Sequence, residues 1–215
     1  MIGIIVVLMT RKDIEFNLEK FKAVVTYVIG RCEPARLGAV KLHKVLYYSD
    51  MLMYLASGSP ITGAPYRRRP FGPTCDPLLT VLDSLSTAGN IRIDVVDYYG
   101  FQKKEFTALA KLESNHLSKA ETRVLDEIVN FVCDNNTAQT ISDFSHDLVW
   151  EMVEYGDIIH YHNAIHLVPT LPSAEAKSWA GLELEKIEGS RSKSSSQRVE
   201  GIDSGAFRER LAEMR

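Results

Sequence analysis

Apolar residues recur at helical spacing in the first part of the chain. This spacing predicts a helix over residues 13–30 whose apolar face is formed by Phe16, Phe21, Val24, Val25 and Val28. The segment "RCEPARLG" contains Pro34 and Gly38 and therefore predicts a break. A second helix is expected over "VKLHKVLYYSDMLMYLASG", with Gly58 as its C-terminal stop.

Turn and capping signals divide the middle of the chain. Asp76 followed by Pro77 predicts the start of a third helix over about 77–88, because Asp caps helices and Pro fits their first position. The alternating run 91–96 is expected to pair with 104–109 as a β-hairpin across "DYYGFQK". Ser118 and Glu121 form a capping box that opens a fourth helix, and Thr137 or Thr140 begins another.

These elements predict a mainly α (α+β) fold: a compact helical domain over 13–170 with a small β-hairpin. Residues 1–12 are expected to form an N-terminal arm, and residues 171–215 a helix followed by a flexible tail, because "GSRSKSSSQ" is polar and of low complexity. The start "MIGIIVVLM" is too short to span a bilayer. Two interpretations of residues 1–8 stay open: translated upstream sequence, or an ordered apolar strand or arm.

Composition narrows the function classes. The chain has 215 residues and a net charge of -3, which disfavours a general nucleic-acid-binding role. Its three cysteines include no Cys-x-x-Cys pair, which indicates small buried thiols in a reducing cytosol rather than a zinc site. We therefore expect a cytoplasmic protein without a membrane partner.

The histidines are candidates for metal-binding or acid–base chemistry, whereas the carboxylates Asp94 and Asp97 are expected to be solvated charges. His160, His162 and His166, with Glu154 or Asp157, would form a metal site, but local packing around a turn is the favoured interpretation. His146 lies one helical turn before Trp150, so the two rings are expected to touch; a structural role is favoured over a general base. His43 and His116 are expected to be exposed. No nucleophile elbow or Gly-rich phosphate loop is present, so we predict no enzyme, no cofactor and no metal.

An arginine run, "YRRRPFGPTCDP", precedes the predicted hairpin. With the hairpin aromatics it predicts a binding patch for an acidic surface or RNA, against the alternative of a solvated edge. In an extended run, Arg67 and Arg69 share a face and Arg68 points the other way. The candidate protein-binding residues are Tyr66, Arg67, Arg69, Tyr98, Tyr99 and Phe101.

The order of these motifs resembles the Panacea domain, or SocA-like antitoxin, family over roughly residues 15–168. The resemblance is carried by Lys41, Leu42, Lys44, Leu46 and Tyr47, then Thr62, Gly63, Ala64, Tyr66, Gly72 and Pro73, and later Ser145, His146 and Trp150. The chain departs from the family pattern at His160, where a proline is common, and at Cys75. The resemblance makes Lys41, Leu42, Lys44, Tyr47, Gly72, Pro73, His146 and Trp150 structural motif residues.

What the resemblance implies is an antitoxin of a bacterial or phage toxin–antitoxin system, which neutralises a cognate toxin encoded beside it by direct binding. One alternative is a proteolytic adaptor that delivers the toxin to an AAA+ protease such as a Clp-type unfoldase complex. The other is a nucleic-acid-binding autoregulator that uses Arg67–Arg69.

Overall fold

The computed structural model describes residues 14–109 and 116–167, together with Ser178 and Leu182. The chain divides into two compact units, Met1–Pro169 and Thr170–Arg215. The N-terminal arm and almost all of the C-terminal tail lie outside the described residues, so their predicted structures stay predictions. Among the helices that are described, none is long and apolar enough to cross a membrane.

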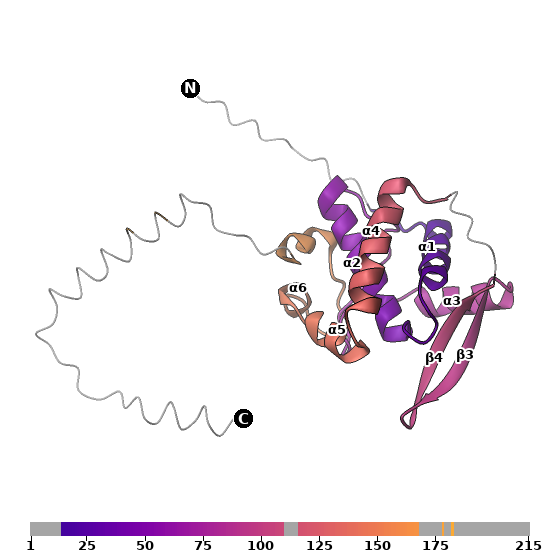
Figure 1. Cartoon of the computed structure of the whole chain (residues 1–215). Helices are drawn as coiled ribbons and strands as arrows, with labels where there is room; N and C mark the ends of the chain where they lie inside the picture. Colours follow the sequence, from indigo (N-terminus) through magenta and orange to yellow (C-terminus); the bar gives the residue numbers. More distant parts are fainter. Residues whose placement is uncertain (1–13, 110–115, 168–177, 179–181, 183–215) are drawn as a thin grey trace, which may run out of the picture. The chain divides into compact units, whose positions relative to one another are not determined.

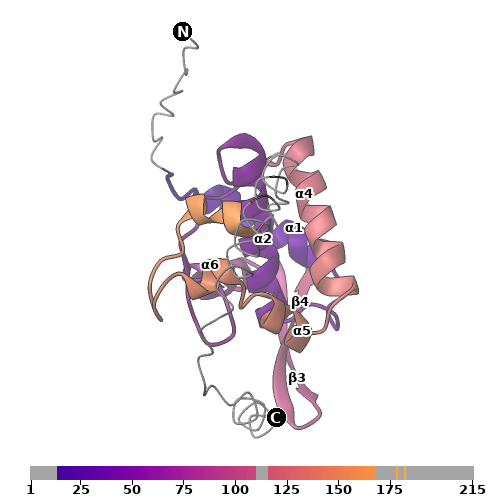
Figure 2. The same cartoon turned by 90° about the vertical axis from the view of Figure 1, so that its left-hand side faces the viewer.

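The first unit is organised around α2 (Ala39–Ser57). Helices α1 (Leu18–Arg31) and α4 (Lys119–Val129) run beside it, and α5 (Ala138–Phe144) packs near one end (Figures 1 and 2). Leu42, Val45, Leu46, Tyr47 and Met51 are each at most 1% exposed. Because these positions cover more than one face of α2, the helix is buried on several sides and forms the centre of the core.

Local capping chemistry sets the ends of α1 and α2. The Asn17 side chain accepts a hydrogen bond from the Lys20 backbone N–H, so α1 begins after Phe16 and that residue stays 39% exposed. The expectation that Phe16 belongs to the helical face is therefore wrong. Gly58 closes α2 in the left-handed region at φ 76°, as its sequence position predicts.

Helix α3 (Leu78–Thr87) lies within the predicted range but lacks the predicted cap. Pro77 occupies the capping position and offers no side-chain acceptor. The Asp76 carboxylate instead pairs with the Arg67 guanidinium, with 2.5 Å between Nε and Oδ2. The prediction of an Asp76 cap is wrong because a charged partner competes with the backbone N–H groups for this carboxylate.

The predicted hairpin is confirmed and is longer than expected. Strands β3 (Ile91–Tyr98) and β4 (Phe101–Ala108) pair antiparallel from Ile91 opposite Ala108 to Tyr98 opposite Phe101. A second small sheet, which the sequence did not predict, pairs β1 (Tyr66–Arg67) with β2 (Thr74–Cys75). Strands of two residues are too short to show alternation, so no sequence signal marks them.

The remaining elements complete a mainly α fold with small β-hairpins, as predicted. The capping box of Ser118 and Glu121 opens α4, which continues into the π-helical turn η2 (Asn130–Asp134). Thr137, not Thr140, caps α5. The short helix α6 (Leu148–Glu151) and the 3-10 helix η3 (Tyr161–Leu167) close the described part of this unit.

Candidate protein-binding surface

The tip of the β3–β4 hairpin carries exposed aromatic side chains. Tyr98, Tyr99 and Phe101 are 55%, 87% and 76% exposed. Tyr99 and Gly100 form the two-residue turn, and both have positive φ values, 51° and 83°. This pairing is typical of a type I′ turn, whose twist matches that of the flanking strands. The hairpin reaches beyond the helices in both views (Figures 1 and 2), so its tip is presented away from the core.

The backbone at Tyr99 is strained. Asn, Asp and Gly are the residues that normally occupy the first position of such a turn, whereas an L-residue with a bulky side chain in the left-handed region costs about 1–2 kcal/mol. Among the described residues, the ring of Tyr99 stacks edge-on against Tyr98 alone, at 4.9 Å between centroids, and remains mostly in solvent. Packing within the described fold therefore does not account for a tyrosine here.

The base of the hairpin is held firmly. Ile91 and Phe106 are at most 1% exposed, and the two strands pack against α3 and α1. On β4, Lys103 donates to the Ala35 carbonyl and pairs with Glu105 at 3.0 Å. A rigid base beneath an exposed tip limits the conformational entropy that binding would cost.

The arginine run, residues 67–69, lies away from the hairpin tip. The side chains of Arg67 and Arg68 contact other parts of the protein. Besides its ion pair with Asp76, Arg67 donates from Nη1 to the Gly156 carbonyl at 2.9 Å. The Arg68 guanidinium lies 3.8 Å from the Trp150 ring centroid and 4.5 Å from that of Tyr155, and it donates to the Val153 carbonyl. These contacts fasten the run to the segment around α6.

Arg69 is the exposed member of the run. Its backbone carbonyl accepts a hydrogen bond from Trp150 Nε1 at 3.1 Å, while its side chain makes no hydrogen bond or ion pair to the described residues. The His146 ring stacks on Trp150 at 4.2 Å, which confirms the predicted contact between them. In Figure 1 the region of α6 and the hairpin lie on different sides of the unit. The structure therefore does not join the arginines and the hairpin aromatics into one patch.

Tyr66 belongs to the core. It is 0% exposed and its hydroxyl donates to Asp50 Oδ2 at 2.8 Å, so it is not available to a partner in this fold. Asp50 also accepts from the backbone N–H and hydroxyl of Thr62 and from the hydroxyl of Tyr161. Burial raises the pKa of the Asp50 carboxyl, while these hydrogen bonds oppose that effect. The sequence analysis missed this network, which ties α2 to η3.

Lys44 contacts two of the other predicted motif residues, Gly72 and Pro73. Its buried ammonium donates to the carbonyls of Phe71 and Pro73 at 2.5 and 3.0 Å. Burial lowers the pKa of Lys44 to about 7, and the nearby Asp147 carboxylate acts in the opposite direction. Gly72, at φ 85°, lies directly against Lys44 and Ser145, where a Cβ atom has no room. We call this arrangement of Lys44 around the Gly72-Pro73 turn the lysine clamp.

The remaining histidines are either packed against neighbouring groups or exposed. His43, expected to be exposed, is partly buried, and its Nδ1 accepts a hydrogen bond from the Cys75 backbone N–H at 3.1 Å. That expectation is wrong because His43 lies on α2 beneath β2, and its burial lowers its pKa to about 4. His116 is exposed as expected. The rings of His160 and His162 stack at 5.2 Å, and no group of three or more His, Cys, Asp or Glu side chains within the described ranges is arranged to hold a metal.

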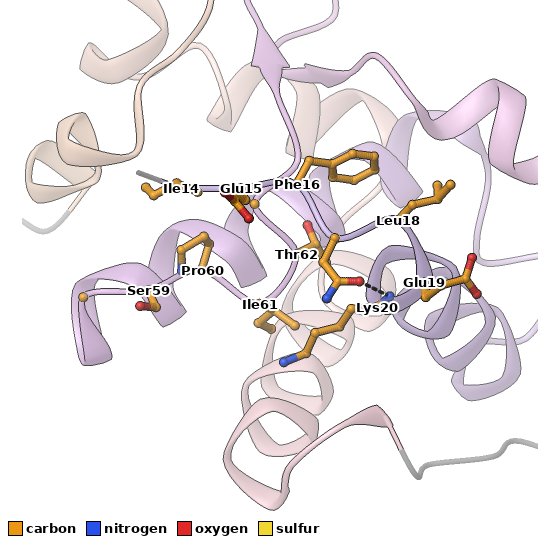
Figure 3. Close-up of a pocket in the computed structure, with 13 residues that line it drawn as sticks. Ile14, Glu15, Phe16, Leu18, Glu19, Lys20, Ser59, Pro60, Ile61 and Thr62 are labelled. Atoms are coloured by element: carbon orange, nitrogen blue, oxygen red, sulfur yellow. Dashed lines mark hydrogen bonds between the residues drawn. The ribbon is translucent and has the colours of Figure 1, made fainter. Parts of the chain in front are cut away.

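A groove of about 760 Å³ separates the segment before α1 from the segment after α2 (Figure 3). Its walls mix apolar side chains such as Ile14 and Pro60 with polar ones, and the Lys20 ammonium at its edge is already paired with Glu121 at 2.5 Å. Gly63, at φ 70°, lets the two segments approach closely at one point. No set of polar groups converges on the groove, so its walls do not indicate a small-molecule site.

Comparison with known proteins gives one match. A family model described as "Antitoxin SocA-like, Panacea domain" matches residues 42–151, which include the lysine clamp and the complete hairpin. Searches of curated proteins and of solved structures gave no match.

Proposed function

Because the chain belongs to the SocA-like antitoxin (Panacea domain) family, we propose that it neutralises a toxin by binding it directly through the aromatic tip of the β3–β4 hairpin. The observation that carries the choice of surface is the strained and almost fully exposed Tyr99 between Tyr98 and Phe101. The cognate toxin is the product of a neighbouring gene, and the protein acts on it by masking a surface rather than by chemistry.

The physical properties of the tip suit such a role. Aromatic side chains dominate the energetic centres of protein interfaces, because each covers about 150–250 Å² and loses little conformational entropy. Because the three side chains are only 55–87% exposed, they would supply roughly half of the ~800 Å² that each partner buries in a standard interface. The rest would come from neighbouring side chains, of which Val95 on β3 is already 58% exposed.

Arg67 and Arg69 lie apart from the hairpin tip, so we propose them as a separate, secondary contact for a toxin, with a smaller expected effect. Arg69 is free to pair with an acidic group on a toxin, whereas Arg67 would first have to leave Asp76 and the Gly156 carbonyl. We therefore expect charge reversal at Arg69 to weaken toxin binding more specifically than charge reversal at Arg67, which would also disturb the fold.

The test is co-expression of the full chain with the product of the adjacent gene. We expect that product to stop growth when expressed alone and growth to recover with this protein. Replacing Tyr98, Tyr99 and Phe101 together by alanine should abolish the recovery, while thermal unfolding stays cooperative. Leu148→Ala is the matched control, because Leu148 is 55% exposed but lies on α6.

Two results would contradict the proposal at different levels. A neighbouring product that is harmless, or that stays lethal beside this protein, contradicts toxin neutralisation itself. Full recovery of growth with the triple alanine variant contradicts only the assignment of the hairpin tip.

The two alternative functions gain no specific support. The engagement of Arg67 and Arg68 with the region of α6 leaves one arginine of the run for phosphate contacts, which weakens the proposal of a nucleic-acid-binding autoregulator. An adaptor role would rest on the tail beyond residue 190, which lies outside the described residues. Deleting residues 190–215 separates this role from neutralisation, because an adaptor would lose toxin degradation while retaining toxin binding.

A further inference from the structure

Two cysteines that are far apart in the sequence lie side by side in the fold. Cys32 follows the last residue of α1, and Cys133 lies in η2, yet their Sγ atoms are 3.6 Å apart. Both thiols are free. Cys133 is 4% exposed, whereas Cys32 is partly exposed at the end of its helix. The sequence analysis treated the cysteines as separate buried thiols and did not anticipate this contact.

The surroundings favour a thiolate in this pair. The Cys32 S–H donates a hydrogen bond to the Cys133 sulfur, and this lowers the pKa of Cys133 although its burial acts to raise it. The nearby Lys41 ammonium, which donates to the Cys133 carbonyl at 3.1 Å, also favours the negative charge. The pKa of Cys32 is raised, so Cys133 is the thiol of the pair that ionises more readily.

Cys75 differs on each of these points. It is 1% exposed, and burial raises its pKa well above the usual value. Neither of the other cysteines is hydrogen-bonded to it in the described structure. It therefore serves as an internal reference for a buried and unreactive thiol.

We propose that Cys32 and Cys133 are a site of reversible oxidation, at which a peroxide converts the dithiol into an intramolecular disulfide. The Cys133 thiolate attacks one oxygen of hydrogen peroxide, which breaks the O–O bond, forms a sulfenic acid and releases hydroxide. The Cys32 sulfur then attacks the sulfenic sulfur and displaces a second hydroxide, which forms the S–S bond. The Cys32 proton and the proton that Cys133 gave to solvent on ionising combine with the two hydroxides to form two waters, and two electrons pass from the sulfurs to the peroxide.

The geometry permits this bond with a small movement. The sulfurs must approach from 3.6 Å to about 2.0 Å, a change of roughly 1.6 Å. Cys32 has extended backbone angles, φ -104° and ψ 144°, at the end of α1, so its side chain can move without breaking helical hydrogen bonds. Lys41, on α2, would then face a neutral disulfide.

The disulfide would join the end of α1 to the end of the α4–η2 segment. The two cysteines are 101 residues apart, so the closed loop contains α2, the lysine clamp and the hairpin. A cross-link over a loop of this length strongly restricts the unfolded chain. We therefore expect oxidation to raise the midpoint of thermal unfolding by about 5–10 °C and to slow proteolysis. In a reducing compartment such a bond would be transient, as is typical of redox-responsive pairs.

The experiment is peroxide treatment of the full chain, followed by intact-mass measurement and peptide mapping without reductant. We expect a mass decrease of about 2 Da, corresponding to the two hydrogens lost, and a cross-linked peptide that contains Cys32 and Cys133. Dithiothreitol should restore the mass. Cys32→Ser should abolish the cross-link and the thermal shift, whereas Cys75→Ala should leave both unchanged.

Several outcomes would overturn the proposal. These are retention of all free thiols after peroxide, a cross-link that includes Cys75, a disulfide between two chains, or irreversible oxygen addition at Cys133 without a cross-link. Peptide mapping of the peroxide-treated chain without substitutions distinguishes these outcomes even if a variant folds poorly. The result is independent of toxin neutralisation, because no toxin is present in the experiment.

Discussion

The lysine clamp makes Gly72→Ala an informative substitution. An added Cβ at this position would approach the Lys44 ammonium to 2.5 Å and would also overlap the hydroxyl of Ser145. The hydroxyl and the ammonium must therefore move. Lys44 then loses the geometry in which it donates to the carbonyls of Phe71 and Pro73, although its charge remains in a buried site.

Two contributions set the magnitude for Gly72→Ala. An alanine held at φ 85° costs about 1–2 kcal/mol relative to glycine. Disturbing the hydrogen bonds of a buried charge costs about 1.5–3 kcal/mol more. The free energy of unfolding should therefore fall by roughly 3–5 kcal/mol, a large share of the ~5–15 kcal/mol that stabilises an ordinary domain.

Gly100→Ala is the matched control for this prediction. Gly100 has nearly the same backbone angle, φ 83°, but no atom lies within 4 Å of its added Cβ. The free energy of unfolding of the Gly100→Ala variant should fall only by the backbone contribution of about 1–2 kcal/mol. Urea unfolding of both variants measures the difference. Equal losses for the two substitutions would refute the role assigned to the clamp, because the backbone strain would then explain everything.

Three further predictions concern individual side chains. Tyr99→Asn relieves the strained turn and should raise the free energy of unfolding by about 0.5–1 kcal/mol while it weakens toxin neutralisation; a lower melting temperature would contradict the strain. The pKa of Lys44 falls from 10.5 to about 7 on folding, so between about pH 7 and pH 10.5 the unfolded chain binds the extra proton and the free energy of unfolding rises with pH, by at most ~1.4 kcal/mol per unit. Lys44→Met should flatten this slope in urea unfolding at pH 7 and 9, and an unchanged slope would count against the lowered pKa. Asp50→Ala strands the buried donors of Thr62 and Tyr66 and should cost about 3–5 kcal/mol, more than the isosteric Asp50→Asn; equal melting temperatures for the two variants would contradict the network.

Elements with strong local signals could be predicted from the sequence. Gly58 ends α2, and the Ser118–Glu121 capping box begins α4, because each feature depends on residues within one helical turn. The hairpin was predicted from its alternation, and its exposed aromatic residues were already candidates for binding. The length of the hairpin was underestimated because Tyr99 is not a residue that normally indicates a two-residue turn.

Features that depend on distant contacts could not be predicted. Asp76 lies where a helix cap is expected, but its carboxylate pairs with Arg67, nine residues away along the chain. Lys44 and the Phe71 carbonyl are 27 residues apart, and the two cysteines are 101 apart. The sequence contains these residues but no signal of which ones meet. Tyr66 was misjudged as a surface candidate for the same reason, because its partner Asp50 lies on another element.

The lysine clamp is buried in the core, whereas the hairpin tip is exposed, so substitutions at the two places have different effects. Substitutions at Lys44 or Gly72 disturb buried contacts that hold the loop against α2, so they change stability and every function that depends on the fold. The rings of Tyr99 and Phe101 lie mostly in solvent, and their replacement removes little buried area. Under the proposed function, partner preference can therefore change at the hairpin tip at nearly constant stability, since the anchored base of the hairpin does not depend on which side chains the turn presents.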